Sequence, residues 1–374
     1  MEKHWASVWG SAISIAENRP AAYAKDITFR YPIYSHFGGS AVKITFDNYC
    51  GTEPVFFDKV TLMIDEEFIP VTFSGKRSAE IAAGGRLTTD EIHHEIKPKS
   101  LITISFWFRD FTLLRSAVFT SGPLTEGYYA MGDLTETLNI PEKIVRPTGI
   151  FYFLSNVSVF TAKENRSIVC YGDSITAQDW PDYLALRCIS EGKDNTSIVR
   201  RAASGTRLLR EYDNIVYESY GLMGRKRFAH EVPTDAADTV IIQHGINDII
   251  HPVGTEVNPF RPMSDMPTAA EMISVLEYYI SEARGLGYKV YIGTLLPIEG
   301  WRTYAPFREE VRAEFNDWIR ATPLIDGCID FDKALADPVQ PTKMLAKFDS
   351  GDHLHPSKFG YKQMAETVPP ELLK

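Results

Sequence analysis

Two short segments of the sequence carry side chains that could together perform nucleophilic catalysis. Ser174 stands in a Gly-Asp-Ser triplet directly after the apolar run 167–171, and Asp352 and His355 stand three residues apart near the C-terminus. A serine hydroxyl is a poor nucleophile until a base removes its proton, and histidine is the usual base because it titrates near neutral pH. A carboxylate beside the imidazole fixes its tautomer and stabilises the imidazolium. These residue types predict Ser174 as nucleophile, His355 as general base and Asp352 as the acid that orients it.

Each of the two segments also has a plainer interpretation. Ser174 lies between a strand and a helix, where serine commonly serves as an N-cap. The segment 349–356 could be a surface loop whose polar side chains are incidental. Taken alone, each segment leaves the two interpretations about evenly matched. His353 has the same chemistry as His355 but stands next to Asp352, so the three-residue spacing favours His355.

A serine nucleophile also needs hydrogen-bond donors for the charge that develops on the tetrahedral intermediate. The backbone N–H of Ser174 would lie near a helix N-terminus, where negative charge is stabilised. Asn247 follows the apolar strand 239–243 and could direct its side-chain N–H to the same place. Gly205, in the loop 203–207, could present a backbone N–H at close range. Taken alone, Asn247 and Gly205 are more often ordinary turn residues.

The order of these segments along the chain is more informative than any one of them. A Gly-Asp-Ser turn, a glycine loop, a Gly-x-Asn-Asp segment after a strand and a C-terminal Asp-x-x-His follow one another. Over residues 165–374 the sequence resembles the SGNH (GDSL) hydrolase superfamily. The resemblance implies a flavodoxin-like three-layer α/β/α fold, with no metal and no organic cofactor. It assigns a triad of Ser174, Asp352 and His355, and an oxyanion hole made by the N–H of Ser174, the N–H of Gly205 and the side chain of Asn247.

The resemblance has two further implications. Asp173 and Asp248 would be mainly structural and would hold loops. Similar sequences often read Gly-Asn-Arg-Leu-Leu where this chain has Gly-Thr-Arg-Leu-Leu from Gly205 onward. The backbone donor of Gly205 survives this change, whereas a side-chain contact at Thr206 is in doubt.

The C-terminal part of the chain must position these residues, and in it apolar strands alternate with helices. Compact apolar runs predict strands at 167–171, 239–243 and 289–295. Helical spacing predicts helices at 180–189, 269–284 and 307–320. Strands that alternate with helices predict a parallel sheet, whose active site lies at the carboxyl ends of the strands. We place this catalytic domain at residues 161–374.

Residues 1–160 have a different pattern, with short strands rich in β-branched and aromatic residues. Strands are predicted at 42–46, 55–63, 68–73, 101–108 and 150–153. Their regular spacing predicts an accessory all-β sandwich, jelly-roll-like in type. Bacterial two-domain SGNH esterases, carbohydrate acetylesterases prominent among them, often carry such an N-terminal sandwich. The segments Trp-Gly-Ser-Ala at 9–12 and Thr-Phe-Asp-Asn at 45–48 resemble their opening segments.

The composition argues against several classes of protein. With 39 Lys and Arg against 49 Asp and Glu, the formal charge is −10, which disfavours a nucleic-acid binder. No uninterrupted apolar run approaches the roughly 18 residues of a membrane span, and the N-terminus lacks the apolar segment of a signal peptide. We therefore expect a cytoplasmic protein that does not enter the membrane. The scattered cysteines predict reduced thiols rather than a metal site, and they are Cys50, Cys170, Cys188 and Cys328.

These observations together predict a serine esterase that hydrolyses short-chain acyl esters, acetyl above all, of carbohydrates such as xylo-oligosaccharides. Trp180 and Trp301 are candidates to stack on a sugar ring, although each could instead pack in the core. One alternative is a lysophospholipase or thioesterase with the same triad. Such an enzyme would need a long apolar channel for the acyl chain, and the polar, proline-rich segment 254–267 does not look like the lid of one. The other is a non-catalytic carbohydrate-binding protein. The expected partner is a small acylated substrate, and a homo-oligomer is compatible with the sequence.

Overall fold

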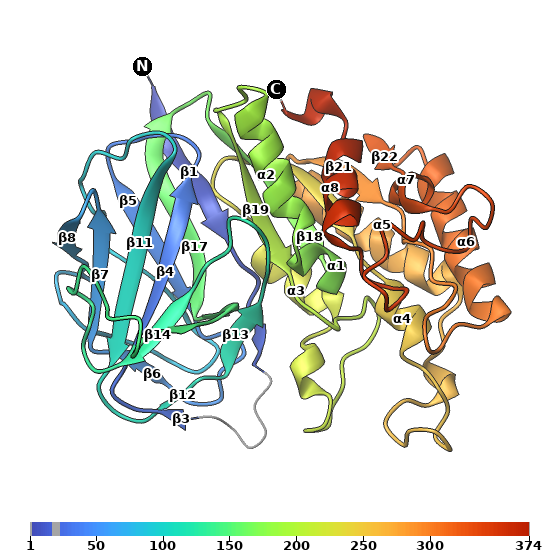
Figure 1. Cartoon of the computed structure of the whole chain (residues 1–374), viewed down its shortest axis with the longest axis horizontal. Coiled ribbons are helices and arrows are strands. Elements are labelled where there is room, and N and C mark those ends of the chain that lie inside the picture. The colour runs from blue at the N-terminus through green and yellow to red at the C-terminus, as the bar shows by residue number, and fades with distance from the viewer. Residues whose placement is uncertain (1, 17–22, 374) are drawn as a thin grey trace. The chain divides into compact units, whose positions relative to one another are not determined.

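The computed structural model describes residues 2–16 and 23–373, and the chain divides into two compact units (Figure 1). The first unit comprises the chain up to Ser167 together with two short later segments, Gly192–Val199 and Thr234–Ala236. The second unit comprises Ile168–Glu191, Arg200–Pro233 and the chain from Ala237 onward. The predicted boundary after residue 160 falls inside a strand, β17 (Leu154–Ala162), that pairs within a sheet of the first unit.

The first unit is all-β, with several antiparallel sheets (Figure 1). One sheet has the strand order β1 (Lys3–Gly10), β17, β5 (Val42–Asp47) and β10 (Arg86–Thr88). A larger sheet has the order β15 (Arg146–Pro147), β14 (Tyr128–Met131), β4 (Ile27–Ser35), β11 (Ser100–Phe108), β7 (Lys59–Ile64) and β8 (Glu67–Pro70). The smaller sheets are β16 (Ile150–Tyr152) with β13 (Ser116–Phe119) and β2 (Ser14–Ile15), β12 (Thr112–Leu113) with β3 (Tyr23–Ala24), and β6 (Val55–Phe57) with β9 (Ala79–Ile81).

The core of the first unit is rich in aromatic rings. Strand β11 shows how the sequence builds it, because side chains alternate between the two faces of a strand. Every second residue of β11 from Ile102 to Phe108 is completely buried, so one face of the strand is continuously apolar. Phe106 from this strand packs against Phe57, with the ring centroids 5.4 Å apart. The strand predicted at 101–108 is confirmed.

The single strand predicted at 55–63 is wrong, because the structure has two strands there, β6 and β7. The break falls at Asp58, whose carboxylate accepts the backbone N–H of Arg109 at 2.9 Å. The two strands have different partners, since β6 pairs with β9 while β7 pairs with β11 and β8. Apolar character continues across residue 58, so the sequence pattern does not show the break.

The α/β part of the chain contains one five-stranded sheet. Its strand order is β19 (Thr196–Ala202), β18 (Arg166–Gly172), β20 (Ala237–Gln243), β21 (Lys289–Gly293) and β22 (Gly327–Ile329). The β20–β21 and β21–β22 pairs are parallel. Counted along the chain the order is 2-1-3-4-5, which is common in doubly wound sheets. The predicted parallel sheet is confirmed, and β21 ends two residues before the predicted strand does.

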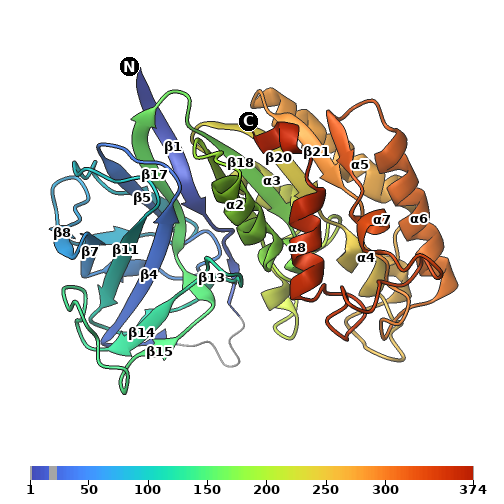
Figure 2. The same ribbon diagram turned by 45° about the horizontal axis from the view of Figure 1, so that its top comes forward.

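Helices accompany this sheet. Figures 1 and 2 both show α2 and α8 in front of the sheet and α5 behind it. The three predicted helices are confirmed within two residues at each end as α2, α5 and α6. The helices are α1 (Ser174–Ala177), α2 (Trp180–Ser190), α3 (Gly224–Glu231), α4 (Ile246–Ile250), α5 (Ala269–Gly285), α6 (Pro306–Ala321), α7 (Phe331–Leu335) and α8 (Lys358–Thr367), with short 3₁₀ turns at Glu218–Tyr220, Met263–Asp265 and Pro370–Leu373.

Helix α5 shows how the sequence sets both the start and the buried face of a helix. The N–H of Glu271 donates to Oγ1 of Thr268 at 3.2 Å, and the N–H of Thr268 donates to the carboxylate of Glu271 at 2.8 Å. This capping box satisfies donors that the first turn would otherwise leave unpaired. The buried residues recur every three or four positions, as an apolar stripe requires, and they are Met272, Val275, Leu276, Tyr279 and Ala283.

Strands β18, β19 and β20 each end beside a loop that carries a predicted site residue. Ser174 follows β18, Gly205 follows β19, and Asn247 follows β20. Parallel strands end at the same edge of a sheet, so these loops converge there. The fold therefore brings together residues that are far apart in the sequence.

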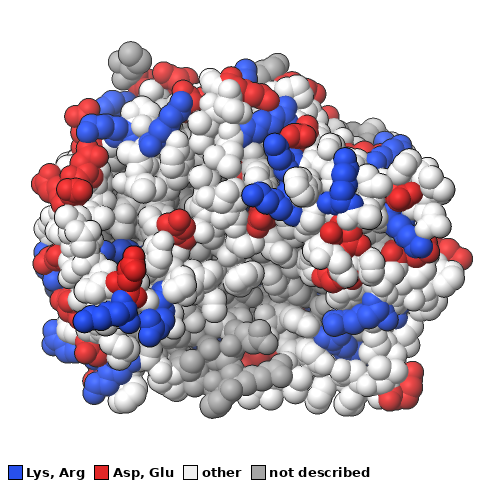
Figure 3. Space-filling view, viewed as in Figure 1, with Lys and Arg blue, Asp and Glu red and all other residues white. Residues whose placement is uncertain are grey.

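The described surface and interior fit the composition. On the face shown in Figure 3, acidic and basic side chains are interspersed and form no large patch of one sign. Among the described residues, no helix combines the length and the apolar character that a membrane span needs. The four cysteines form no disulfide, and three of them are buried.

Candidate active site

Ser174 stands at the turn between β18 and α1. The preceding residue, Asp173, is the N-cap, because its carboxylate accepts the N–H of Ile175 at 3.1 Å. Ser174 is thus the first residue of the helix, and its Oγ lies 2.9 Å from Nε2 of His355. The plainer interpretation of Ser174 as an N-cap is wrong, since Asp173 takes that role.

His355 is held from its other side by Asp352. Its Nδ1 lies 2.7 Å from Oδ2 of Asp352, while Oδ1 accepts the backbone N–H groups of Leu354 and His355 at 2.9 and 2.8 Å. Burial raises the pKa of Asp352, but the hydrogen bonds from His355 and Leu354 outweigh it and hold the pKa below its usual range. Asp352 is therefore ionised at neutral pH and accepts a hydrogen bond from the N–H at Nδ1 of His355, which leaves Nε2 as an acceptor toward Ser174.

The neighbouring histidine, His353, belongs to a separate pair. Its Nδ1 lies 2.6 Å from Oδ2 of Asp349, and its side chain is half exposed. Within the described ranges no hydrogen bond joins His353 to Ser174. The geometry thus distinguishes the two histidines, because only His355 contacts the serine.

Gly205 and Asn247 lie beside this serine–histidine pair. Gly205 has a φ of 79°, a left-handed conformation that favours glycine, and a Cβ there would lie 2.4 Å from the ring of Tyr220. The buried Nδ2 of Asn247 donates to the carbonyl oxygen of Thr206 at 3.0 Å. That bond orients the amide and uses one of its two protons, which leaves the other for an acceptor in front of it.

One pocket of about 260 Å³ joins these residues. Four of the five predicted site residues line it, and Asp352 lies behind His355. The structure therefore brings all five together, although they come from four separate segments. The other residues of the wall are Gln178, Ser204, Tyr220, Ile250, His251, Trp301, Arg302 and Leu354.

The two tryptophans proposed to contact a sugar differ in position. Trp301 lines the pocket. Trp180 is fully buried, donates from Nε1 to Oγ1 of Thr176 at 3.3 Å, and packs against Phe331 with the ring centroids 5.7 Å apart. The sugar-stacking interpretation of Trp180 is wrong and its alternative, packing in the core, is confirmed, because α2 turns this side chain inward.

Residues 170–363, just over half of the chain, match the GDSL-like lipase/acylhydrolase family. The chain belongs to this family. Its reaction class is therefore acyl ester hydrolysis. No curated protein matches the chain.

Several solved structures of GDSL proteins are similar to part of the chain. The lipase/acylhydrolase of Enterococcus faecalis is 23% identical with a TM-score of 0.41, over 56% of this chain and 95% of that one. A catalytic mutant of Axe2, an acetylxylan esterase of Geobacillus stearothermophilus, is 18% identical with a TM-score of 0.41, over 56% and 94% of the two chains. A G-D-S-L family protein of Veillonella parvula is 19% identical with a TM-score of 0.37, over 54% and 96%.

Thr206, where this chain departs from similar sequences, makes side-chain contacts of its own. Its Oγ1 donates to the carbonyl of Ala203 at 2.9 Å and accepts from Nη1 of Arg227 at 2.9 Å. Nε2 of His244 lies 3.1 Å from the same Oγ1. Threonine at this position therefore anchors the Gly205 loop to buried side chains beneath it.

Arg227 is the centre of this buried support, and sequence analysis did not identify it. Its guanidinium is fully buried and pairs with Glu231 at 2.8 Å. It also donates to the carbonyls of Gly172 and Arg201, at 3.3 and 3.2 Å. One cation thus ties together the ends of β18 and β19 and the Thr206 loop. The spacing of arginine and glutamate four residues apart on α3 could have predicted this ion pair. It could not have predicted that the pair lies beneath the site.

Asp248 supports the loop next to the site. Its two carboxylate oxygens accept the N–H groups of Leu208 and Leu209 at 2.7 and 3.0 Å. Burial raises the pKa of Asp248 to about 6 despite these bonds, and burial raises that of Asp173 to about 7. Both aspartates are buried behind the pocket and contact backbone, as the structural role implied by the resemblance requires.

His244 leads to a pH-dependent stability prediction. Burial, and then the charge of Arg227, lower the pKa of His244 to about 3, whereas the unfolded chain takes up the proton near pH 6.5. The stabilisation from a neutral His244 is therefore complete above pH 6.5 and is lost as the pH falls toward 3. Between pH 8 and pH 5, the free energy of unfolding of the wild type should fall by about 2 kcal/mol more than that of His244→Gln.

Denaturant titrations of both proteins at the two pH values measure this difference. The exposed His93 provides a control, because His93→Gln should show the same pH dependence as the wild type. The decisive quantity is the difference in the free energy of unfolding between the wild type and His244→Gln. If this difference is the same at pH 8 and at pH 5, the fold does not hold His244 neutral.

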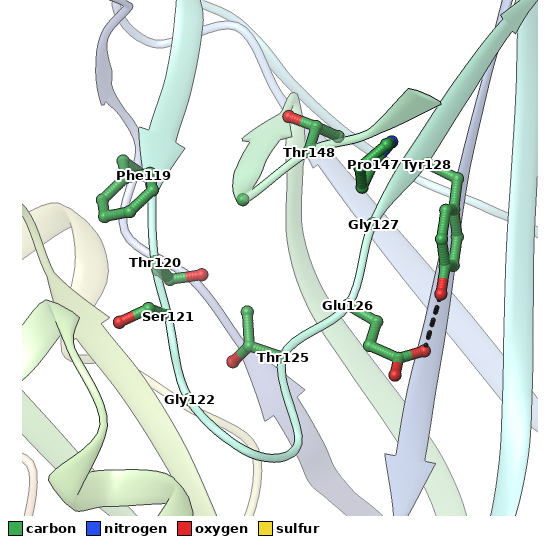
Figure 4. A pocket seen from close by; sticks show the side chains of 11 residues that line it. Phe119, Thr120, Ser121, Gly122, Thr125, Glu126, Gly127, Tyr128, Pro147 and Thr148 are labelled. Atoms are coloured by element: carbon green, nitrogen blue, oxygen red, sulfur yellow. Dashed lines mark hydrogen bonds between the residues drawn. The ribbon is translucent and has the colours of Figure 1, made fainter. Parts of the chain in front are cut away.

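The first unit has a pocket of its own, of about 410 Å³ (Figure 4). Figure 4 shows a loop with Thr120, Ser121 and Thr125 on one side and Tyr128 on the other, where the Tyr128 hydroxyl donates to Glu126 at 3.1 Å. This pocket has no histidine in its described wall, so it lacks a base for a serine. In the described part of the chain, no cluster of three His, Cys, Asp or Glu side chains is arranged to hold a metal ion.

Proposed function

We propose that the protein is a serine esterase that removes short acyl groups, above all acetyl, from carbohydrates such as xylo-oligosaccharides. The observation that carries the proposal is the hydrogen-bonded series from Ser174 through His355 to Asp352, which opens into a pocket of only about 260 Å³. A nucleophile, a base and an orienting acid in contact are the arrangement that acyl transfer to serine needs.

The reaction follows from these contacts. Oγ of Ser174 attacks the acyl carbonyl carbon while Nε2 of His355 takes its proton, and Asp352 stabilises the imidazolium. The oxyanion that forms accepts hydrogen bonds from the N–H groups of Ser174 and Gly205 and from the second amide proton of Asn247. His355 then donates its proton to the leaving alcohol, and a water activated by His355 hydrolyses the acyl-enzyme to release the acid.

The pocket wall favours a small acyl group and a polar alcohol. Its aliphatic side chains are few, Ile250 and Leu354, which is too little apolar surface to enclose a long acyl chain. Tyr220 and Trp301 provide ring surfaces of the kind on which a sugar packs. These features support a sugar ester more than a lipid or thioester.

The proposal includes a domain arrangement. We take the α/β part as a flavodoxin-like three-layer α/β/α domain at residues 161–374. We take residues 1–160 as a jelly-roll-like β-sandwich that is accessory to it. Together they would form the two-domain carbohydrate esterase arrangement that the sequence resembles.

Chain-length preference tests the proposed substrate class. The kcat/KM values of 4-nitrophenyl acetate, butyrate and octanoate should fall in that order, with acetate at least about tenfold better than octanoate. Acetic acid should also be released from acetylated xylo-oligosaccharide, and Ser174→Ala is the background control. Preference for octanoate would favour a lysophospholipase or thioesterase, and hydrolysis of none would favour a non-catalytic binding protein.

A further inference from the structure

The pocket that contains Ser174 and His355 has an unbalanced charge. None of the described residues that line it is an aspartate or a glutamate, whereas Arg302 contributes a guanidinium. The carboxylate of Asp352 lies behind the pocket and is already engaged by His355. A ligand in this pocket therefore meets a cation with no matching anion.

Arg302 is held in place by a short turn. Its guanidinium carbon lies 4.5 Å from the centre of the Trp301 ring. The turn is closed by the N–H of Tyr304, which donates to the carbonyl of Trp301 at 2.8 Å, and Thr303 anchors it by donating to the carbonyl of Ile250 at 2.9 Å. Arg302 is exposed and forms no ion pair with any described residue. A cation stacked on an aromatic ring loses little freedom when it binds an anion.

Further cations stand behind the wall to which Tyr220 belongs. Arg261 donates to the Tyr220 hydroxyl at 3.1 Å and has no ion pair within residues 2–16 and 23–373. Arg207 and Arg210 share one carboxylate, that of Asp265, at 3.1 and 3.5 Å. Positive charge therefore exceeds negative charge on this side of the pocket as well.

His251, in the pocket wall, experiences this excess directly. Its pKa lies well below its usual range, because it is buried and because Arg261, Arg207 and Arg302 each disfavour a further positive charge beside them. The field of Arg302 and of the cations behind the wall thus reaches a side chain that lines the pocket.

We propose that the natural substrate carries a carboxylate on its alcohol part, as an acetylated uronic acid does, and that Arg302 binds this carboxylate. The inference rests on the proposed function, since an acetyl group has no position for a charge and the anion must then belong to the alcohol. The planar guanidinium of Arg302 presents two parallel N–H groups, the geometry that a carboxylate accepts. Arg302 is a substrate-binding residue in this account and takes no part in bond making.

A matched pair of substrates tests the inference. Acetylated methyl glucuronoside and acetylated methyl glucoside differ only in the carboxylate that replaces a hydroxymethyl group, so the scissile bond is the same. We expect kcat/KM, measured by release of acetic acid, to be about tenfold higher for the glucuronoside. The preference should shrink as salt is raised toward about 1 M, because Arg302 is exposed and its field is screened.

Three variants locate the preference. Arg302→Gln should reduce the glucuronoside-to-glucoside ratio of kcat/KM to about one, and Arg302→Lys should retain part of it because the charge remains without the planar fork. Arg225→Gln is the control, because Arg225 is also an exposed arginine stacked on a ring, 4.6 Å from that of Tyr278, but does not line the pocket. Arg225→Gln should keep the wild-type ratio.

The outcomes separate this inference from the proposed function. If the enzyme hydrolyses 4-nitrophenyl acetate, and hydrolyses the acetylated glucuronoside and the acetylated glucoside with equal kcat/KM, the carboxylate inference is overturned and the esterase proposal stays intact. A preference that survives in Arg302→Gln would overturn the role of Arg302. If none of the three substrates is hydrolysed, the proposed function is overturned, and this inference with it.

Discussion

Replacing Ser174 with alanine should lower kcat for 4-nitrophenyl acetate by about 10⁴-fold or more. In the proposed mechanism the substitution removes the atom that attacks the ester, and the residual rate comes from substrate binding and the oxyanion donors alone. The fold should persist, because Asp173 rather than Ser174 caps α1, and the hydroxyl that is lost bonds to no described residue other than His355. Steady-state kinetics with a thermal unfolding curve of each protein measure both parts of the prediction.

A second serine of the same pocket provides a matched control. Ser204 lines the pocket but has no hydrogen bond to His355 among the described residues. Ser204→Ala should therefore retain most of the wild-type turnover. Near-normal turnover in Ser174→Ala would remove Ser174 from the mechanism.

Asn247→Ala should raise the activation barrier by about 2.7–4 kcal/mol, which is a loss of about 10²–10³-fold in kcat. In the proposed mechanism, the amide proton that is not bonded to Thr206 donates to the oxyanion, and only the transition state carries the full charge there. The Michaelis constant should change little. Steady-state kinetics on 4-nitrophenyl acetate separate the two parameters.

Asn247→Asp sharpens this experiment. The aspartate has nearly the same size but offers an acceptor in place of the amide donor, and a carboxylate would repel the oxyanion. We expect Asn247→Asp to be at least as slow as Asn247→Ala. A variant that changed only KM would make Asn247 a substrate-binding residue instead.

The sequence was sufficient to place the main site residues because their positions follow from the topology of a parallel sheet. Ser174, Gly205 and Asn247 each follow a strand, and strands that run in parallel deliver such residues to one edge. The Asp-x-x-His spacing allowed one loop to carry both Asp352 and His355. These relationships depend on local sequence and strand order, which a pattern can reveal.

Other features depend on packing that a pattern cannot reveal. Asp173 and Ser174 are both good N-cap residues, and only the helix geometry shows that Asp173 takes the cap. Trp180 and Trp301 have the same chemistry, yet α2 buries Trp180 while a turn brings Trp301 to the pocket.

The support beneath the site was also beyond sequence analysis. Arg227 reaches Gly172, Arg201 and Thr206, three positions that come together only after the strands have been ordered in the sheet. The excess of positive charge around the pocket has the same origin. The chain as a whole carries a formal charge of −10, so its composition points away from a cationic site.

Labelling with a fluorophosphonate tests whether Ser174 is the nucleophile, because the reagent phosphonylates an activated serine and needs no knowledge of the substrate. We expect one adduct on the wild type, located by mass spectrometry on the peptide that contains Ser174, with parallel loss of esterase activity and no adduct on Ser174→Ala. An adduct on another residue, or full hydrolysis of 4-nitrophenyl acetate by protein labelled at Ser174, would contradict it.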